Sequence, residues 1–396
     1  MAEHYGAQAM APTAPPAPGH QRPNVTVYAR TLDPKYANHY ILRHARSIEA
    51  DTIVARRSSL SSVHQIGSRH QLVGRADAAL RRVEEVLPAG RLVSSHSRRL
   101  AKVLASTDVL YVMFLWSALE CWPAVRATRA AGVPLRFVVL AAGSDVAAVE
   151  RASLRQQRAY LRMMSDADVL LAGSDHLVGR LTAVGARAPE PRRHYIGTTV
   201  PSIDELEEHR RPLTLVAASR LVPVKGVDKT IESFARVVRE EPEARLRIVG
   251  DGPLRGDLEG LSARLGVGRA VEFLGELSPD DTLREISRAS LLVQHNVRAP
   301  DGSEEGLGGT ILEAQARRVP VVVADSGGVA EALVHGETGL LVRSGDVEGM
   351  ASSIVTLLRD PDRLRRMGVE SRTFIETVHN ARLQDERLAE HVRGPA

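Results

Sequence analysis

Short runs rich in Val, Ile and Leu alternate with amphipathic segments along most of this 396-residue chain. The first series begins near Asn24 and consists of NVTVYA (24–29), TIVARR (52–57), DVLYVMFLW (108–116), LRFVVLAA (135–142) and DVLLAGS (168–174). Buried strands that alternate with helices form a parallel sheet covered on both faces. The first half of the chain is therefore predicted to be a doubly wound α/β domain.

A second series of the same kind follows a break at VPSIDELEEHRRP, residues 200–212. Its runs are LTLVAAS (213–219), RLRIVGDG (245–252), AVEFLGE (270–276), ASLLVQHN (289–296), VPVVVAD (319–325) and TGLLVRS (338–344). We predict two Rossmann-like domains, residues 24–200 and 201–375, each of a size that one core supports. A ligand is expected in the cleft between them, at the carboxyl ends of the strands.

Composition and charge indicate which kinds of segment and binding site the chain can contain. Residues 1–23 are rich in Pro and Ala and are predicted to form a disordered leader. We expect a cytoplasmic protein, because no apolar run approaches the ~20 residues of a membrane span and no signal-peptide pattern opens the chain. The net charge of +4 and the scattered arginines do not favour a nucleic-acid partner. The single cysteine, Cys121, excludes an internal disulfide and a cysteine-rich zinc site.

Lysine is rare in this arginine-rich chain: Lys35, Lys102, Lys225 and Lys229 are the four. Arg220 and Lys225 follow the predicted strand LTLVAAS, before a helix expected to begin near Val227. A planar guanidinium and a compact ammonium at a strand end suit a diphosphate. The alternative is a pair of solvated loop charges.

The run IVGDGPL, residues 248–254, is a strand that ends in a tight turn at Gly252. It lacks the glycine spacing and the following acidic residue of a nicotinamide-dinucleotide site. Gly252 is therefore predicted either to contact a nucleotide or to be part of an ordinary strand-to-helix turn.

The stretch SEEGLGGTILEAQA, residues 303–316, places two glutamates on either side of a glycine-rich turn. The turn consists of Gly306, Leu307, Gly308 and Gly309 and leads into a helix expected to begin near Thr310. Glycines let the backbone approach a ligand, and the N–H groups at a helix start favour an anion. We predict that Glu313 accepts hydrogen bonds from a ribose diol and that Glu305 reaches a sugar. Two unrelated solvated glutamates are the alternative.

Together these runs resemble glycosyltransferase family 4, a family of retaining enzymes with the two-domain GT-B fold. The resemblance is carried by SRLVPVKGVDKTIESFARV, LRIVGDGPL, EFLGEL and the segment from APDGSEEGLGGTILEAQ to GETGLLV, and covers the second half almost continuously. It implies that Arg220 and Lys225 bind the donor diphosphate, Glu313 the ribose, and Glu305 with the glycine turn the donor sugar. It also implies that residues 376–396 cross back onto the first domain.

The first domain departs from that family. YVMF (111–114) stands where the family has His-Ala-His-Phe, and TLDPKYANHY (31–40) replaces the glycine-rich loop after the first strand. In LAAGSD (140–145), Ala142 replaces the family's histidine, whereas Gly143 and Asp145 are kept. The acceptor side is therefore expected to differ from that of a typical member.

Four histidines near predicted strand ends, His39, His44, His96 and His295, are either structural or substitutes for the missing one. Of these, His39 in the altered loop is the acceptor-side candidate. Asp166 and Asp168 superficially match an Asp-x-Asp metal motif, but their position between a helix and a strand favours a solvated turn. No metal is expected, since cations and a helix start can neutralise a leaving diphosphate.

These residues predict a retaining glycosyltransferase that moves a sugar from a nucleotide-diphosphate donor to a small molecule and needs no further cofactor. Arg220 and Lys225 would assist departure of the diphosphate while Glu305 orients the sugar. A soft nucleophile such as sulfur would suit a site without the histidine at position 142. The alternatives are a nucleotide-sugar epimerase and a non-catalytic nucleotide-sugar-binding subunit. The base, the sugar, the acceptor and the oligomeric state stay open.

Overall fold

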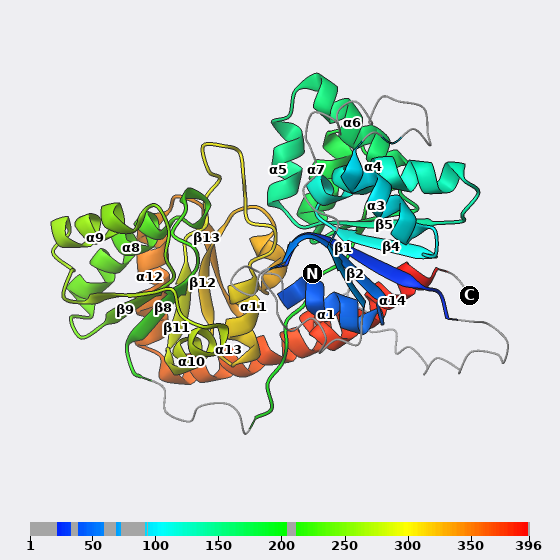
Figure 1. The fold of residues 1–396 in the computed structure, drawn as a ribbon. Coiled ribbons are helices and arrows are strands. Elements are labelled where there is room, and N and C mark those ends of the chain that lie inside the picture. Colours follow the sequence, from blue (N-terminus) through cyan, green and yellow to red (C-terminus); the bar gives the residue numbers. More distant parts are fainter. Residues whose placement is uncertain are drawn as a thin grey trace.

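Two parallel β-sheets, each flanked by helices, form two domains in the computed structural model (Figure 1). The structure describes residues 22–32, 39–58, 69–72, 92, 94–203 and 211–394. The predicted leader, residues 1–23, lies outside this part of the chain except for Arg22 and Pro23. Arg22 forms ion pairs with Glu49 at 2.7 Å and Asp51 at 2.8 Å, which fasten it to the N-terminal domain.

The N-terminal sheet has the strand order β3-β2-β1-β4-β5-β6-β7, and its strand pairs are parallel. Its strands are β1 (Val25–Leu32), β2 (Thr52–Ser58), β3 (Arg69–Leu72), β4 (Val109–Met113), β5 (Arg136–Ala141), β6 (Val169–Ala172) and β7 (Arg192–Arg193). Its helices are α1 (His39–Ser47), α3 (Ser95–Leu104), α4 (Leu115–Ala130), α5 (Ser144–Glu150), α6 (Leu154–Ser165) and α7 (Asp175–Ala183). The order reverses at β1 and β4, which is the switch point where doubly wound sheets bind ligands.

The C-terminal sheet repeats this arrangement in the order β10-β9-β8-β11-β12-β13. Its strands are β8 (Thr214–Ala218), β9 (Arg245–Val249), β10 (Val271–Gly275), β11 (Leu291–Gln294), β12 (Val321–Asp325) and β13 (Gly339–Arg343). Its helical elements are η2 (Pro223–Lys225), α8 (Val227–Glu240), α9 (Arg255–Arg264), α10 (Pro279–Arg288), α11 (Gly309–Ala316), η3 (Val329–Ala332), α12 (Val347–Leu358) and α13 (Pro361–Phe374). Both predicted doubly wound sheets are confirmed.

Local chemistry explains where several helices begin. Ser153 and Gln156 form a capping box at the start of α6, and the Ser278 hydroxyl accepts the N–H of Asp281 at the start of α10.

Each of the eleven predicted β-rich runs overlaps a strand. The strands β3 and β7 were missed, because RHQL and RR are short and polar and have no strand-like pattern.

The chain crosses between the domains twice, and the two crossings lie side by side. Thr198 on the first crossing donates its N–H to His379 O at 2.8 Å and accepts the N–H of Ala381 at 2.8 Å. The second crossing continues from α13 through a π-helical turn, η4 (Ile375–His379), into α14 (Ala381–Arg393). Figure 1 shows α14 beside α1 of the N-terminal domain, and Leu388 is completely buried in the core of that domain.

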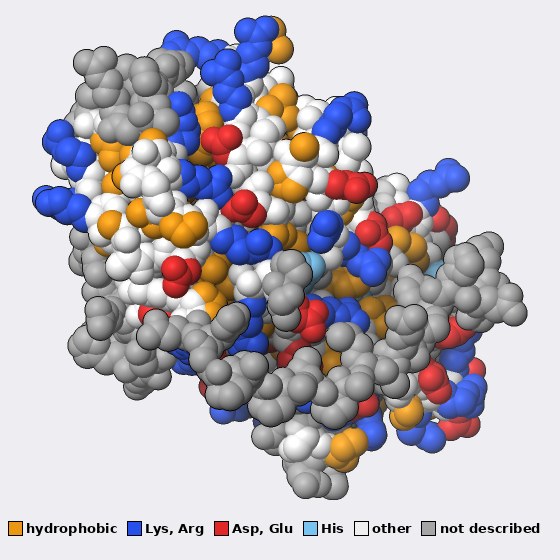
Figure 2. Space-filling model, turned by 90° about the vertical axis from the view of Figure 1, so that its right-hand side faces the viewer, with side chains coloured by type: hydrophobic (Ala, Val, Ile, Leu, Met, Phe, Trp, Pro, Cys, Tyr) orange, Lys and Arg blue, Asp and Glu red, His pale blue; other side chains and the backbone are white. Residues whose placement is uncertain are grey.

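The face in Figure 2 carries Lys and Arg side chains interspersed with acidic and hydrophobic ones, so its charge is mixed. Among the described helices, none combines the length and the apolar character that a membrane span needs.

Candidate functional site

Glu305 is the centre of a charged cluster at the start of the glycine turn. Its carboxylate forms an ion pair with Lys225 of η2 and accepts a 2.9 Å hydrogen bond from Asn296 Nδ2. Only 14% of the Glu305 side chain and 17% of the Lys225 side chain are exposed. The structure thus brings together two residues predicted for the site, 80 positions apart in the sequence.

The charge on Glu305 is stabilised by its surroundings. Burial alone raises its pKa, but the Lys225 ammonium and hydrogen bonds from Lys225, the Gly306 N–H and Asn296 outweigh burial and lower the pKa of Glu305 below its usual value. Glu305 is therefore a carboxylate near neutral pH, able to accept hydrogen bonds from sugar hydroxyls.

Asn296 was not singled out in the sequence, although its place at the end of the run ASLLVQHN was a usable signal. It is completely buried, and its Oδ1 has no hydrogen-bond partner among the described residues. Gln294, at the end of β11, accepts a 3.2 Å hydrogen bond from Thr310 Oγ1, and its buried Nε2 is likewise unpaired within the described part. Buried polar atoms normally have partners, so these two suit a polar ligand.

The glycine turn has a backbone that favours glycine. Gly308 has φ of 96°, in the left-handed region, and directly precedes α11. A methyl group added to Gly306 would lie 2.6 Å from the carbonyl oxygen of Ala142 in the other domain. Leu307 packs against the apolar cluster that contains Ile311 and Leu312 of α11. The turn is thus closely packed, and its backbone meets that of the N-terminal domain directly before the start of α11.

Glu313 lies on α11, just over one turn from its start. Burial raises the pKa of Glu313 to about 7, and the nearby Arg317 charge opposes this only in part. A ligand that donates hydrogen bonds to such a carboxyl group stabilises its ionised form. A ribose diol supplies two such donors.

Arg220 and Gly252 lie on neighbouring loops that follow β8 and β9. Arg220 is exposed, unlike Lys225. A methyl group added to Gly252 would lie 2.5 Å from the carbonyl oxygen of Leu221, and Leu221 N donates to Asp251 O at 2.9 Å. Gly252 thus allows these two loops to pack closely, which fits the interpretation of it as a turn residue.

On the acceptor side, Gly143 follows β5 with φ of 134° and faces Gly306 across the junction. Asp145 is completely buried and accepts the N–H groups of Leu115 at 2.9 Å, Gly143 at 2.8 Å and Ala142 at 3.1 Å. Burial raises the pKa of Asp145 and these hydrogen bonds oppose the rise. Asp145 therefore joins the ends of β4 and β5, and its carboxylate is turned into the protein.

Tyr40 of α1 is a second residue that the sequence did not single out. A methyl group added to Gly309 would lie 2.8 Å from the Tyr40 hydroxyl oxygen, so the phenol lies over the first residue of α11. Burial and the negative charges of Glu313 and Glu305 raise the pKa of Tyr40 above its usual value, so the phenol keeps its proton. Tyr40, Phe114 and Ala142 all pack against one apolar cluster of the N-terminal domain.

The histidine candidates are mostly structural. His44 Nδ1 lies 2.8 Å from the Tyr111 hydroxyl, and His96 Nε2 lies 3.3 Å from the Tyr28 hydroxyl, both in the core. His295 Nε2 accepts the Gly345 N–H at 2.9 Å. Burial lowers the pKa of His44 and of His295. His39 begins α1, and its side chain lies outside the described part of the structure.

Asp166 and Asp168 lie in the predicted turn between α6 and β6, and the Asp168 side chain is 41% exposed, but both carboxylates are bonded to other elements. Asp166 accepts the Trp122 indole N–H at 2.6 Å, and Asp168 accepts the Phe137 N–H at 2.6 Å and pairs with Arg129 at 2.5 Å. Both carboxylates therefore fasten α4 and β5 to the turn between α6 and β6. Within the described ranges, no group of three or more His, Cys, Asp and Glu side chains is arranged to hold a metal ion.

Residues 202–374 match the family model described as "Glycosyl transferases group 1". Over 171 residues the chain is 36% identical to the Corynebacterium glutamicum GDP-mannose-dependent monoacylated alpha-(1-6)-phosphatidylinositol monomannoside mannosyltransferase, covering 43% of this chain and 44% of that protein. Over 161 residues it is 32% identical to N-acetyl-alpha-D-glucosaminyl L-malate synthase of Bacillus anthracis, covering 41% of this chain and 40% of the relative. The aligned segments span less than half of each relative.

Solved structures match over nearly the whole chain. Anabaena HepE, solved with UDP and glucose, has a TM-score of 0.77 at 18% identity, covering 94% of this chain and 100% of that one. Sucrose-phosphate synthase of Thermosynechococcus elongatus has a TM-score of 0.73 at 18% identity, covering 94% and 98%. The chain therefore has the two-domain GT-B fold of these proteins, and its C-terminal domain is similar to group 1 glycosyl transferases.

Proposed function

We propose that the protein is a retaining glycosyltransferase that transfers a sugar from a nucleoside-diphosphate donor to a small-molecule acceptor. The observation that carries this proposal is the cluster at the glycine turn. A largely buried, ionised Glu305 lies beside Lys225 and Asn296, directly before the start of α11, and the buried amide oxygen of Asn296 has no partner within the described part of the chain. The match of residues 202–374 to glycosyl transferases supports it.

Each part of the donor has matching chemistry. The diphosphate suits Arg220, Lys225 and the N–H groups at the start of α11, which stabilise the charge left on it when the bond from the sugar carbon breaks. Glu305 and Asn296 suit the hydroxyls of the sugar. Glu313 suits the ribose diol. A new bond from the acceptor to the sugar carbon forms on the same face, and the proton that the acceptor loses goes to the departing diphosphate or to water.

The first test is binding of bare nucleoside diphosphates, GDP and UDP, by calorimetry. Relatives and structural neighbours carry names with GDP-mannose, UDP and UDP-glucose, so both bases belong in the test. Glu313→Gln is expected to weaken nucleotide binding, whereas Glu305→Gln is expected to lower turnover with little change in that binding. Equal losses of nucleotide affinity in both variants would contradict the proposed orientation of the donor.

The acceptor side supports a narrower hypothesis. Ala142 packs in an apolar cluster and offers no group to take a proton from an alcohol. We propose that the acceptor supplies its own nucleophilicity, as a thiolate does. Paired oxygen and sulfur acceptors, offered with the donor that binds, test this by mass spectrometry and NMR of the linkage. Exclusive O-glycoside formation that His39→Ala abolishes would instead identify His39 as the base. Formation of free epimerised donor without an acceptor would indicate an epimerase.

A further inference from the structure

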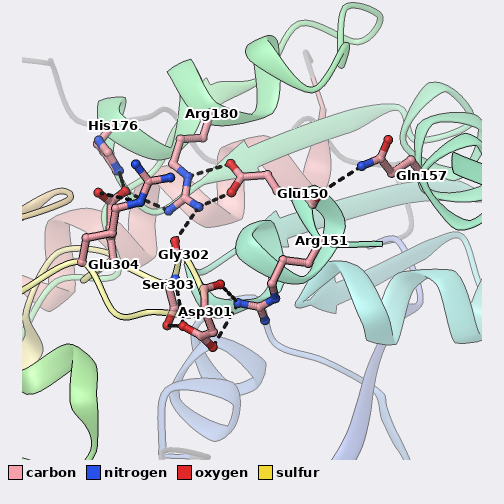
Figure 3. A network of polar contacts seen from close by, with 10 residues as sticks. Glu150, Arg151, Gln157, His176, Arg180, Asp301, Gly302, Ser303 and Glu304 are labelled. Carbon is pink, nitrogen blue, oxygen red and sulfur yellow. Dashed lines mark hydrogen bonds and ion pairs between the residues drawn. The ribbon is translucent and has the colours of Figure 1, made fainter. Parts of the chain in front are cut away.

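A network of charged side chains joins the loop before Glu305 to the N-terminal domain (Figure 3). The loop, residues 301–305, follows β11 in the C-terminal domain, and the side chains that hold it come from α5 and α7. We call Arg180, Glu150 and Glu304 with His176 the loop anchor. It lies outside the set of residues that would touch the donor.

Arg180 of α7 is the centre of the loop anchor. Its guanidinium pairs with both carboxylate oxygens of Glu150, the Nε contact being 2.8 Å, and donates to Glu304 at 3.2 Å and to the Gly302 carbonyl oxygen at 3.3 Å. The Arg180 side chain is only 12% exposed and that of Glu304 17%. The hydrogen bond from Arg180 lowers the pKa of Glu150, so this partner is ionised.

From the N-terminal domain, His176 Nε2 of α7 also lies 3.1 Å from Glu304. The next residue, Glu305, is held by its own domain, because its carbonyl oxygen accepts the Gly328 N–H at 2.9 Å. The Glu305 carboxylate then contacts Lys225 and Asn296. A shift of Glu304 therefore moves the backbone that carries Glu305.

Helix α7 is itself bonded to the C-terminal domain at a second point. The Glu331 carboxylate, from the C-terminal domain, accepts the N–H groups of Asp175 and His176 at 2.8 Å each. The first turn of α7 and Arg180 further along it thus both contact the C-terminal domain. Two separate contacts fix the orientation of α7 against the loop.

Arginine suits this position because its planar fork serves two carboxylates and a carbonyl at once. Without Arg180, Glu150 and Glu304 would lie as like charges at a partly buried junction. The loop would then lose its Arg180 contacts. Among the ion pairs of the described residues that join it to the N-terminal domain, it would keep only those of His176 with Glu304 and of Arg151 with Asp301, at 3.1 Å and 3.0 Å. Lys225, Arg220 and Glu313 would keep their places in the C-terminal domain.

We propose that Arg180 is a positioning residue that holds Glu305 in place for the donor sugar when the two domains are in contact. This inference rests on the proposed glycosyl transfer. The two parts of the donor then depend on different domains. The C-terminal domain alone binds the nucleotide, whereas orientation of the sugar also needs the N-terminal domain.

Kinetics of Arg180→Gln provide the first test. We expect kcat to fall about 10- to 100-fold, because misplacement of a reacting group by about 1 Å costs that much. Affinity for the bare nucleoside diphosphate should change less than threefold. A loss of nucleotide affinity as large as the loss of kcat, or an unchanged kcat, would overturn the proposal.

Arg247→Gln is the matched control. Arg247 likewise bridges two carboxylates, Glu272 and Glu285 at 2.7 Å, with 20% of its side chain exposed, but all three residues lie within the C-terminal domain. Its kcat should stay near that of the wild type. Equal losses of kcat in both variants would show a general effect of removing an ion pair and would overturn the assignment of Arg180.

Hydrogen–deuterium exchange tests the contact independently of activity. Arg180→Gln should speed exchange in residues 301–309, with β8 and β12 unchanged, and Glu304→Gln should give the same pattern. The double variant should then lose less than the sum of the two single ones, since both remove the Arg180–Glu304 contact. Unchanged exchange in the loop would overturn the anchor even if the enzyme is active. Faster exchange in a protein that binds no nucleoside diphosphate would leave the anchor standing and refute the proposed function.

Discussion

At the scale of single residues, Glu305 and Lys225 depend on each other. Removing Lys225 leaves a largely buried carboxylate without its counterion, whereas Arg220 is exposed. We expect Lys225→Ala and Arg220→Ala each to raise the barrier to transfer by about 2–4 kcal/mol. Only Lys225→Ala should also reduce the free energy of unfolding, by roughly 3 kcal/mol. The measurements are kcat/KM and melting temperature; a Lys225→Ala protein that melts like the wild type would show that Glu305 does not need this partner.

Glu313 predicts a dependence of stability on pH. Its pKa in the folded protein is raised to about 7 from the ordinary glutamate value of 4.5, so folding favours the protonated carboxyl group. This contribution is complete below pH 4.5 and is lost as the pH rises through about 7. Glu313→Gln should remove this dependence on pH, which amounts to about 2–3 kcal/mol of the free energy of unfolding between these two pH values. Denaturant unfolding of both proteins from pH 4.5 to pH 8 tests this; parallel pH profiles would argue against the raised pKa.

The sequence contained enough information to predict that Glu305 and Lys225 lie near each other, because both follow parallel strands of one sheet. It did not predict Tyr40 or Arg180. Their contacts cross between domains, and no periodicity within one domain indicates which side chain of the other domain will approach.

At the scale of elements, the glycine turn before α11 packs against the turn after β5. A methyl group at Gly306 would meet the Ala142 carbonyl, which is backbone and moves only with the whole turn. We expect Gly306→Ala to lower kcat/KM at least tenfold, because the turn and Ala142 must separate. Gly256→Ala, on α9 with open space around it, is the control and should behave like the wild type. Normal activity of Gly306→Ala would mean that the two turns need not touch.

For the whole molecule, the stability of the N-terminal domain depends on the last helix of the chain. Leu388 of α14 is completely buried against that domain, and Arg43 of α1 pairs with Asp385 at 3.2 Å. We expect Leu388→Ala to reduce the free energy of unfolding of this domain by about 2–5 kcal/mol. The exposed Leu154, at 74%, is the control, and Leu154→Ala should have little effect.

Tryptophan fluorescence reports this loss selectively. Both tryptophans of the chain, Trp116 and Trp122, lie on α4 of the N-terminal domain. Their unfolding transition should move to lower denaturant in Leu388→Ala. A transition that stays in place would mean that α14 contributes little to this domain.

The sequence by itself determined the two doubly wound sheets, because burial of parallel strands on both faces requires apolar runs that stand out along the chain. It also placed Glu305, Lys225 and the glycine turn at strand ends of one domain. Only the tertiary structure decided that Asp145 turns inward, that Asp166 and Asp168 fasten a helix, and that Tyr40 and Arg180 reach the other domain. The physical reason is that hydrogen bonds and ion pairs between distant segments depend on side-chain direction and on how two domains meet. A linear pattern of apolar and polar residues carries neither.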